Sequence, residues 1–286
     1  MEVELKQVDW LSGSTIALRF VPLTSESIKF RPGQFFRFTF NDDLGDFERS
    51  YSLCNLDDSV NNGEISTSKF DLVISKVEKG RATDLLFSAS QGLVASVTGP
   101  FGRLVIPQRL PPRIILVATS VGIAPYLPML RQLEIPLAAG EVQLTFLFGA
   151  RDESEILYAD FLVKYQQKYA ASVDFRVSLS RDMAVSEPSI ASYVHAGYVQ
   201  QQLAQLELDA SKDLVMLCGN PAMVDECFDL LKHEGFGVRQ VIREKYVFAK
   251  DPVSQPTRKA LTDEQRKLIA EKMNKERMER REALRN

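Results

Sequence analysis

The N-terminal part of the chain alternates short apolar runs with breaks of Gly, Pro, Asn and Asp. The runs have the length and composition of short β-strands. The clearest runs are 16–20, 35–40, 70–74 and 93–97, and turn signals occur at 31–33, 41–43, 61–63 and 99–100. Short, regularly spaced strands with such turns predict a small antiparallel β-barrel over residues 1–110.

The pattern changes after Pro111 and Pro112. Residues 114–118 are continuously apolar, as expected for a strand buried on both faces of a parallel sheet. The predicted elements that follow are helix 126–133, strand 142–148, helix 156–169, strand 173–179, helix 198–206, strand 214–217 and helix 221–234. This alternation predicts an open parallel α/β sheet over residues 111–250, joined to the barrel by a linker at 107–112.

The last segment, 251–286, has a different composition. Pro252 and Pro256 interrupt regular structure, and 262–265 reads Thr-Asp-Glu-Gln, a capping box that opens a helix. Residues 258–286 contain ten basic and six acidic side chains. We expect a charged extension, helical or partly disordered, that could serve as a partner-docking or homo-oligomer contact.

Bulk composition narrows the function classes. The chain has 286 residues, is 45% hydrophobic and 26% charged, and carries a net charge of −3, which disfavours binding driven by nucleic-acid phosphates. No apolar run is long enough to insert in a membrane.

Cys54, Cys218 and Cys227 lack the spacing of a zinc or iron–sulfur site, and we predict no metal site. Together with an N-terminus unlike a secretory signal, they favour a reducing, cytoplasmic location. His195 and His233 are assigned surface or packing roles, and Cys227 is interpreted as a small buried hydrophobe.

The most informative short motif is Arg49-Ser50-Tyr51-Ser52, which lies in a predicted strand. In a strand, Arg49 and Tyr51 point to one face, and the two serines point to the other. A cation, an aromatic ring and small hydroxyls suit a ligand with an anionic part, a flat ring and a hydrogen-bonding edge. A flavin dinucleotide has all three features.

Three further motifs follow predicted sheet strands, where open α/β sheets bind ligands. The loop 119–125 reads Thr-Ser-Val-Gly-Ile-Ala-Pro, and Gly122 would let its backbone approach a phosphate. Arg151 and the pair Ser180-Arg181 follow the next two strands. Two arginines at one sheet edge suit the 2′-phosphate of NADP.

The third of these motifs, Cys218-Gly219-Asn220-Pro221, follows the strand 214–217. Gly219 permits a tight turn, and Pro221 suits the first position of a helix. The Cys218 thiol at the strand end is a plausible neighbour for a redox-active ring.

In this order, the motifs resemble those of the ferredoxin–NADP reductase superfamily, most of all its bacterial ferredoxin (flavodoxin)–NADP reductases, over about residues 1–250. The resemblance implies a two-domain β + α/β fold, with FAD on the barrel and NADP on the parallel sheet. It implies hydride transfer between NADP(H) and FAD, and single-electron transfer between FAD and ferredoxin or flavodoxin.

The resemblance also assigns residues to the flavin. Arg49 would meet the pyrophosphate, Tyr51 would pack on the isoalloxazine, and Ser52 would hydrogen-bond near N5. The segment 79–83 resembles a second flavin motif, and 99–102 resembles a turn that closes the barrel. The remaining residues assigned to the flavin are Lys76, Gly80 and Thr83.

For the nucleotide, the resemblance implies a loop at Thr119 and Gly122, 2′-phosphate contacts at Ser180 and Arg181, and adenosine contact at Tyr198. It places Cys218, Gly219, Asn220 and Met223 beside the nicotinamide. Tyr246 is the first choice for the ring that covers the flavin, Phe248 is the second, and Glu244 lies near the proton and electron path. The implied catalytic set is Ser52, Cys218, Glu244 and Tyr246.

Two alternatives stay open. Ser120 and Val121 stand where the family loop has Gly and Thr, and 197–199 reads Gly-Tyr-Val, as also found in NADH-using reductases. One alternative is therefore an NADH-dependent reductase of an oxygenase, or a free-flavin reductase. The other is an FAD-binding electron-relay or regulatory subunit that docks through its charged extension.

Overall fold

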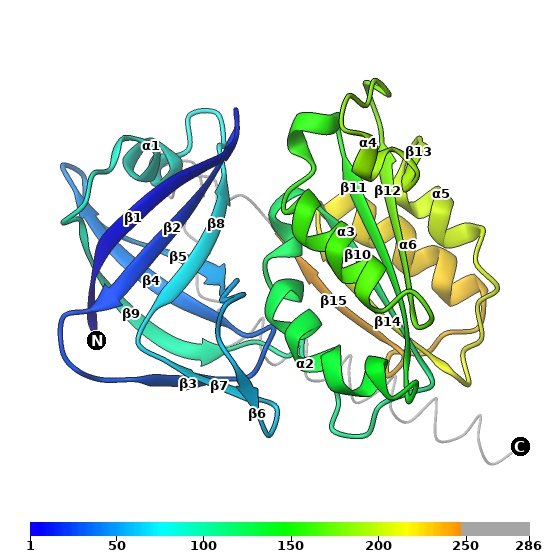
Figure 1. The fold of residues 1–286 in the computed structure, drawn as a ribbon. Coiled ribbons are helices and arrows are strands. Elements are labelled where there is room, and N and C mark those ends of the chain that lie inside the picture. Colours follow the sequence, from blue (N-terminus) through cyan, green and yellow to red (C-terminus); the bar gives the residue numbers. More distant parts are fainter. Residues whose placement is uncertain (247–286) are drawn as a thin grey trace, which may run out of the picture. The chain divides into compact units, whose positions relative to one another are not determined.

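The computed structural model describes residues 1–246. Phe248 and the predicted extension at 251–286 lie outside the described residues. The N-terminal part forms a six-stranded antiparallel sheet in the order β5-β4-β9-β1-β2-β8, beside a three-stranded sheet β3-β7-β6 (Figure 1). The strands are β1 (Glu2–Ser12), β2 (Thr15–Pro22), β3 (Ile28–Phe30), β4 (Phe35–Asp42), β5 (Gly45–Ser52), β6 (Val60–Asn61), β7 (Glu64–Thr67), β8 (Phe70–Ser75) and β9 (Val94–Phe101). Helix α1 (Arg81–Ser88) lies between β8 and β9 in the sequence.

The core of this barrel follows from the alternation seen in the sequence. Along β4, every second side chain is buried, and Phe36, Phe38 and Phe40 point inward. Their rings meet those of Phe20 and Phe70 in edge-on and tilted contacts. The period-2 pattern therefore determines which strand faces build the barrel core.

The second part is a parallel six-stranded sheet in the order β13-β12-β11-β10-β14-β15. Its strands are β10 (Arg113–Thr119), β11 (Gln143–Ala150), β12 (Val173–Leu179), β13 (Val194–Ala196), β14 (Asp213–Gly219) and β15 (Val241–Lys245). Its helices are η1 (Ser120–Ile123), α2 (Tyr126–Ala138), η2 (Glu153–Glu155), α3 (Ala159–Lys168), α4 (Pro188–Ala191), α5 (Val199–Ala204) and α6 (Pro221–His233). The predicted fold class, an antiparallel barrel followed by an open parallel α/β sheet, is confirmed.

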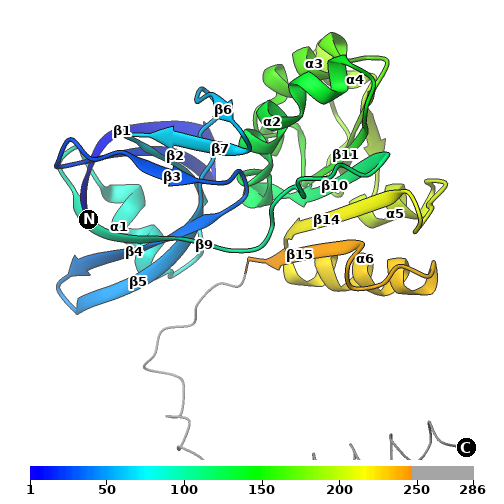
Figure 2. The same cartoon turned by 90° about the horizontal axis from the view of Figure 1, so that it is seen from below.

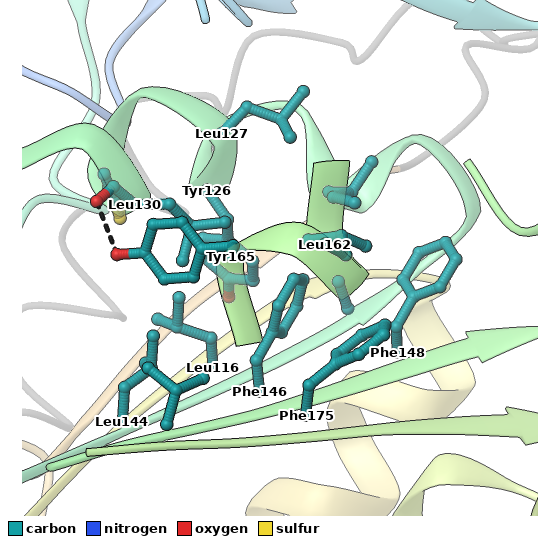
Figure 3. Packing of buried hydrophobic residues seen from close by; sticks show 14 of the residues in the cluster. Leu116, Tyr126, Leu127, Leu130, Leu144, Phe146, Phe148, Leu162, Tyr165 and Phe175 are labelled. Atoms are coloured by element: carbon teal, nitrogen blue, oxygen red, sulfur yellow. Dashed lines mark hydrogen bonds between the residues drawn. The ribbon is translucent and has the colours of Figure 1, made fainter. Parts of the chain in front are cut away.

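Helices cover both faces of the parallel sheet, with α2 and α3 on one side and α5 and α6 on the other (Figure 2). On the first side, Phe146 and Phe175 rise from the strands toward Tyr126 of α2 and Leu162 of α3 (Figure 3). There the Tyr165 hydroxyl donates a hydrogen bond to the Leu130 carbonyl at 2.7 Å. Burial on both faces explains why the strands are continuously apolar in the sequence.

Two local predictions were wrong. The helix predicted for 156–169 begins only at Ala159, because η2 occupies Glu153–Glu155 and Tyr158 has a left-handed φ of 57°. The predicted turn at 99–102 largely belongs to β9, where the pairing with β4 shifts register. Gly99, with a φ of 153°, accommodates this irregularity.

Within residues 1–246, no helix is long and apolar enough to cross a membrane.

Candidate functional site

The Arg49–Ser52 motif lies on the edge strand β5, with the predicted alternation of faces. Arg49 and Tyr51 share the side of the buried Phe47, and the Arg49 guanidinium lies 5.2 Å from the centre of that ring. The guanidinium donates only to the Glu48 carbonyl at 2.8 Å, and no carboxylate of residues 1–246 pairs with it. Arg49 therefore keeps its charge available for an anion.

The start of helix α1 lies beside Arg49. The Arg81 guanidinium is 4.4 Å from the centre of the same Phe47 ring and forms a bidentate pair with Asp42. Gly80 caps the helix without a side-chain hydrogen bond, so the first amides of α1 have no side-chain acceptor at the cap. A Cβ on Gly80 would lie 2.8 Å from the Thr83 hydroxyl, which bonds back to the Gly80 carbonyl at 2.9 Å.

These observations test the fit of a dinucleotide pyrophosphate. Helix N-termini attract anions through their free amides and the helix dipole, and an unpaired arginine adds a positive charge. Arg49, Gly80 and the first turn of α1 form such a cradle, so the residues present fit the flavin pyrophosphate. Lys76, also expected there, has its ammonium 5.9 Å from the Phe87 ring centre.

A polar cluster joins the end of β5 to the end of β15. The Tyr246 hydroxyl donates to the Ser52 hydroxyl at 2.8 Å, and the Ser52 hydroxyl lies 3.4 Å from the Glu244 carboxylate as a donor. The Tyr246 amide donates to the Gly219 carbonyl at 2.9 Å, and Glu244 pairs in register with Cys218 on β14. The structure therefore brings together all four residues of the predicted catalytic set.

The ionisation of this cluster is governed by burial. Burial raises the pKa of Glu244 to about 7, against a smaller lowering by the Ser52 hydroxyl. Burial also raises the pKa of the Cys218 thiol and of the Tyr246 hydroxyl well above their usual values. At neutral pH, Cys218 and Tyr246 are therefore neutral, and Glu244 is poised between its two forms.

The strand ends of β10 and β14 pack against each other closely. The Thr119 hydroxyl accepts a hydrogen bond from the Asn220 amide at 3.0 Å, and a Cβ on Gly219 would lie 2.5 Å from that hydroxyl. A Cβ on Gly122 would lie 2.3 Å from the Cys218 carbonyl oxygen. The close approach of the two loops therefore requires a glycine at position 122. The sequence pattern did not predict this reason for the glycine.

Ser120 stands in the same loop, in a conformation that favours glycine, with a φ of 52°. Its hydroxyl lies 3.0 Å from that of Ser75, which lies 3.1 Å from the Thr15 hydroxyl in the barrel. The serine therefore gains a contact with the barrel that a glycine could not make.

A second group of predicted site residues lies at the same edge of the parallel sheet, beyond the ends of β12 and β13. These residues are Ser180, Arg181 and Tyr198. The Ser180 amide donates to the Ala150 carbonyl at 3.1 Å, and the Gly197 amide, just before Tyr198, donates to the Leu179 carbonyl at 2.9 Å. Tyr198 is 58% exposed, and Arg181 is exposed with no ion-pair partner among residues 1–246. Both side chains are accessible to a ligand beyond the strand ends.

Three other expected contacts are occupied by internal interactions. The Asn220 side chain caps α6 by accepting from the Ala222 amide at 2.9 Å. Met223 is 5% exposed and packs between α6 and the sheet together with Cys227, which is fully buried as predicted. The Arg151 guanidinium binds Glu155 and Ser14, residues that no sequence motif indicated. No local signal could have found the Ser14 contact, because Ser14 is 137 positions away from Arg151.

The anion cradle on the barrel and the loops at one edge of the parallel sheet define a flavin- and nicotinamide-nucleotide-binding oxidoreductase. Residues 2–106 match the family model described as oxidoreductase FAD-binding domain, and residues 116–228 match the oxidoreductase NAD-binding domain. The chain belongs to the ferredoxin–NADP reductase superfamily.

Similar proteins have varied partners. The chain is 29% identical to ferredoxin–NADP reductase B of Sorangium cellulosum, over 86% of this chain and 97% of that one. It is 27% identical to the toluate 1,2-dioxygenase electron transfer component of Pseudomonas putida, over 86% of this chain and 67% of that one. A ferredoxin–NADP⁺ reductase structure from Neisseria gonorrhoeae with bound FAD and NADP superposes with a TM-score of 0.68 at 20% identity, covering 86% and 98% of the two chains.

Proposed function

We propose that this chain is an NADPH-dependent reductase that passes single electrons to a ferredoxin or flavodoxin. The bound flavin would supply the redox chemistry, by exchanging a hydride with the nicotinamide and single electrons with the carrier. The protein supplies binding, orientation and control of protons. The reducing, cytoplasmic location expected from the sequence, and the domain limits 1–110 and 111–250, are part of the same proposal.

The observation that carries this proposal is the cluster of Ser52, Cys218, Glu244 and Tyr246. The Tyr246 hydroxyl meets Ser52 directly after Tyr51, so both tyrosines converge on the same end of β5. In the proposal, Tyr51 and Tyr246 flank the flavin ring. Neither Cys218 nor Tyr246 ionises near neutral pH, which suits a site where the cofactor, and not a protein nucleophile, reacts.

The remaining roles follow from position. Arg49 and the first turn of α1 hold the flavin pyrophosphate. Thr119 and Gly219 shape the edge at which the nicotinamide docks. Arg181 binds the 2′-phosphate. Glu244, with a pKa of about 7, can hold or release a proton beside the Ser52 hydroxyl at physiological pH.

The decisive experiment is the visible spectrum of the purified protein, followed anaerobically during addition of NADPH and then NADH. The proposal expects a yellow protein that NADPH bleaches at lower concentration than NADH does. A colourless protein that takes up no FAD on reconstitution contradicts the proposal.

A variant tests the coenzyme assignment. Arg181→Ala should raise the KM for NADPH by about tenfold or more, because a charged hydrogen bond to phosphate is lost, and should leave the KM for NADH nearly unchanged. Arg176→Ala is the matched control, since Arg176 lies on β12, the strand that Arg181 follows, but pairs with Asp174 at 2.8 Å. Equal effects of Arg181→Ala on both coenzymes would reject Arg181 as the 2′-phosphate ligand.

One observation favours the second candidate, an NADH-dependent reductase of an oxygenase. Arg151 is bound to Glu155 and Ser14, which leaves Arg181 as the unpaired arginine of the predicted pair. Bleaching at lower concentrations of NADH than of NADPH would select this candidate. Bound FAD without reduction by either coenzyme would select the electron-relay subunit instead.

A further inference from the structure

The segment 151–155, which follows β11, contacts both the barrel and the loop after β12. Glu155 accepts hydrogen bonds from the Ser14 hydroxyl at 2.7 Å and from the Ser12 hydroxyl at 3.3 Å, both in the barrel. The same carboxylate oxygen lies 3.1 Å from the Arg151 guanidinium. The Glu155 side chain is 12% exposed, so its charge is held in a largely desolvated setting by these three donors.

Arg151 also shapes the loop that carries Arg181. The Arg151 carbonyl accepts from the Arg181 amide at 2.9 Å and from the Asp182 amide at 3.3 Å. The two arginines therefore lie at adjacent strand ends, but their side chains differ. The Arg151 guanidinium donates to Ser14 at 3.2 Å and pairs with Glu155, whereas Arg181 has no ion pair within residues 1–246.

We propose that Glu155 is a specificity-determining residue, an internal counter-ion that holds Arg151 against the barrel and so weakens the binding of nucleotides that carry a 2′-phosphate. A phosphate monoester carries close to two negative charges at neutral pH and is bound best by unpaired arginines. Glu155 competes for Arg151 and repels the incoming phosphate. The inference rests on the nucleotide site of the proposed function and deepens it.

Calorimetric titration of the purified protein with two probes tests the role of Glu155. The probes are adenosine 2′,5′-bisphosphate and adenosine 5′-monophosphate, which differ only in the 2′-phosphate. Glu155→Gln keeps the shape and an acceptor oxygen but removes the charge. It should bind the bisphosphate roughly three- to tenfold more tightly, the size of a partly exposed charged contact. Its affinity for the monophosphate should not change.

Two further variants locate the effect. The gain should disappear in the double variant Glu155→Gln with Arg151→Ala, because Arg151 is the group that is released. Glu134→Gln is the matched control. Glu134 also pairs with two cations, Arg131 at 2.7 Å and Lys168 at 3.3 Å, but it lies on helix α2 and contacts neither Arg151 nor Arg181 through these pairs. It should change neither affinity.

The proposal is overturned if Glu155→Gln binds the bisphosphate no more tightly than the unaltered protein does, if both probes gain equally, or if the gain persists without Arg151. Ser14→Ala removes the hydroxyl that contacts both Arg151 and Glu155, whereas Ser12 still donates to Glu155, so the bisphosphate affinity should shift in the same direction by a smaller factor. That variant decides the matter if Glu155→Gln does not fold, and an unchanged affinity then overturns the proposal. Equal binding of both probes by the unaltered protein would contradict the NADPH preference, whereas the present inference depends only on the change between variants.

Discussion

Glu244 is a half-buried carboxyl whose ionisation should lower the stability of the fold. It lies opposite Cys218 in the register of β14 and β15, and the Ser52 hydroxyl at 3.4 Å is its polar contact. Burial raises the pKa of Glu244 from 4.5 to about 7. Glu244→Gln keeps the shape of the side chain and removes the titration.

The magnitude follows from proton linkage. Well below pH 4.5, Glu244 is protonated in both the folded and the unfolded chain and does not affect their balance. As the pH rises toward about 7, the unfolded chain releases this proton while the folded chain retains it, so unfolding becomes easier. A difference of this size corresponds to about 3 kcal/mol of lost stability at pH 8, at roughly 1.4 kcal/mol per unit of pKa.

Urea unfolding of the protein and of Glu244→Gln, from pH 4.5 to pH 8, measures this term. The free energy of unfolding of the variant, relative to the unaltered protein, should increase by about 3 kcal/mol across this range and level off above pH 7. Glu141→Gln, at an exposed position, should show no such trend. A constant difference between Glu244→Gln and the unaltered protein at every pH would refute a raised pKa of Glu244.

Two other substitutions test the site and its frame. Tyr246→Ala removes the ring whose hydroxyl bonds Ser52, and should tighten nicotinamide nucleotide binding and change the ratio of KM values for NADPH and NADH; an unchanged ratio would reject Tyr246 as the stacked ring. Gly122→Ala places a Cβ 2.3 Å from a backbone oxygen and should lower the free energy of unfolding, measured in urea, by about 1–3 kcal/mol. Gly13→Ala, with no atom within 4 Å of the new Cβ, is its control, and an equal loss in both variants would show that the close approach at Gly122 is not the cause.

The sequence predicted the order of elements because hydrophobic periodicity is a local property. Alternating residues such as Phe36 and Phe38 specify a strand with one buried face, and the continuous apolar run 114–118 specifies a strand buried on both. The start of α3 was missed because Tyr158 adopts a left-handed backbone that no residue pattern required.

The sequence by itself also determined the chemistry at the strand ends. In a parallel sheet, all carboxyl ends meet at one edge, so Thr119, Arg181 and Cys218 had to gather there once the alternation was recognised. The Arg49 motif indicated a flavin because its residue types alternate on a strand.

Only the tertiary structure decided which of these groups are free to bind. Ser52 and Tyr246 are 194 positions apart, and Ser14 and Glu155 are 141 positions apart. Such contacts depend on how the barrel strands meet the sheet, which no local pattern encodes. Arg151 and Arg181 look equivalent in the sequence, but the fold gives a largely buried counter-ion to Arg151 and gives Arg181 no ion-pair partner among residues 1–246, because only Arg151 lies next to Glu155 and the barrel serines.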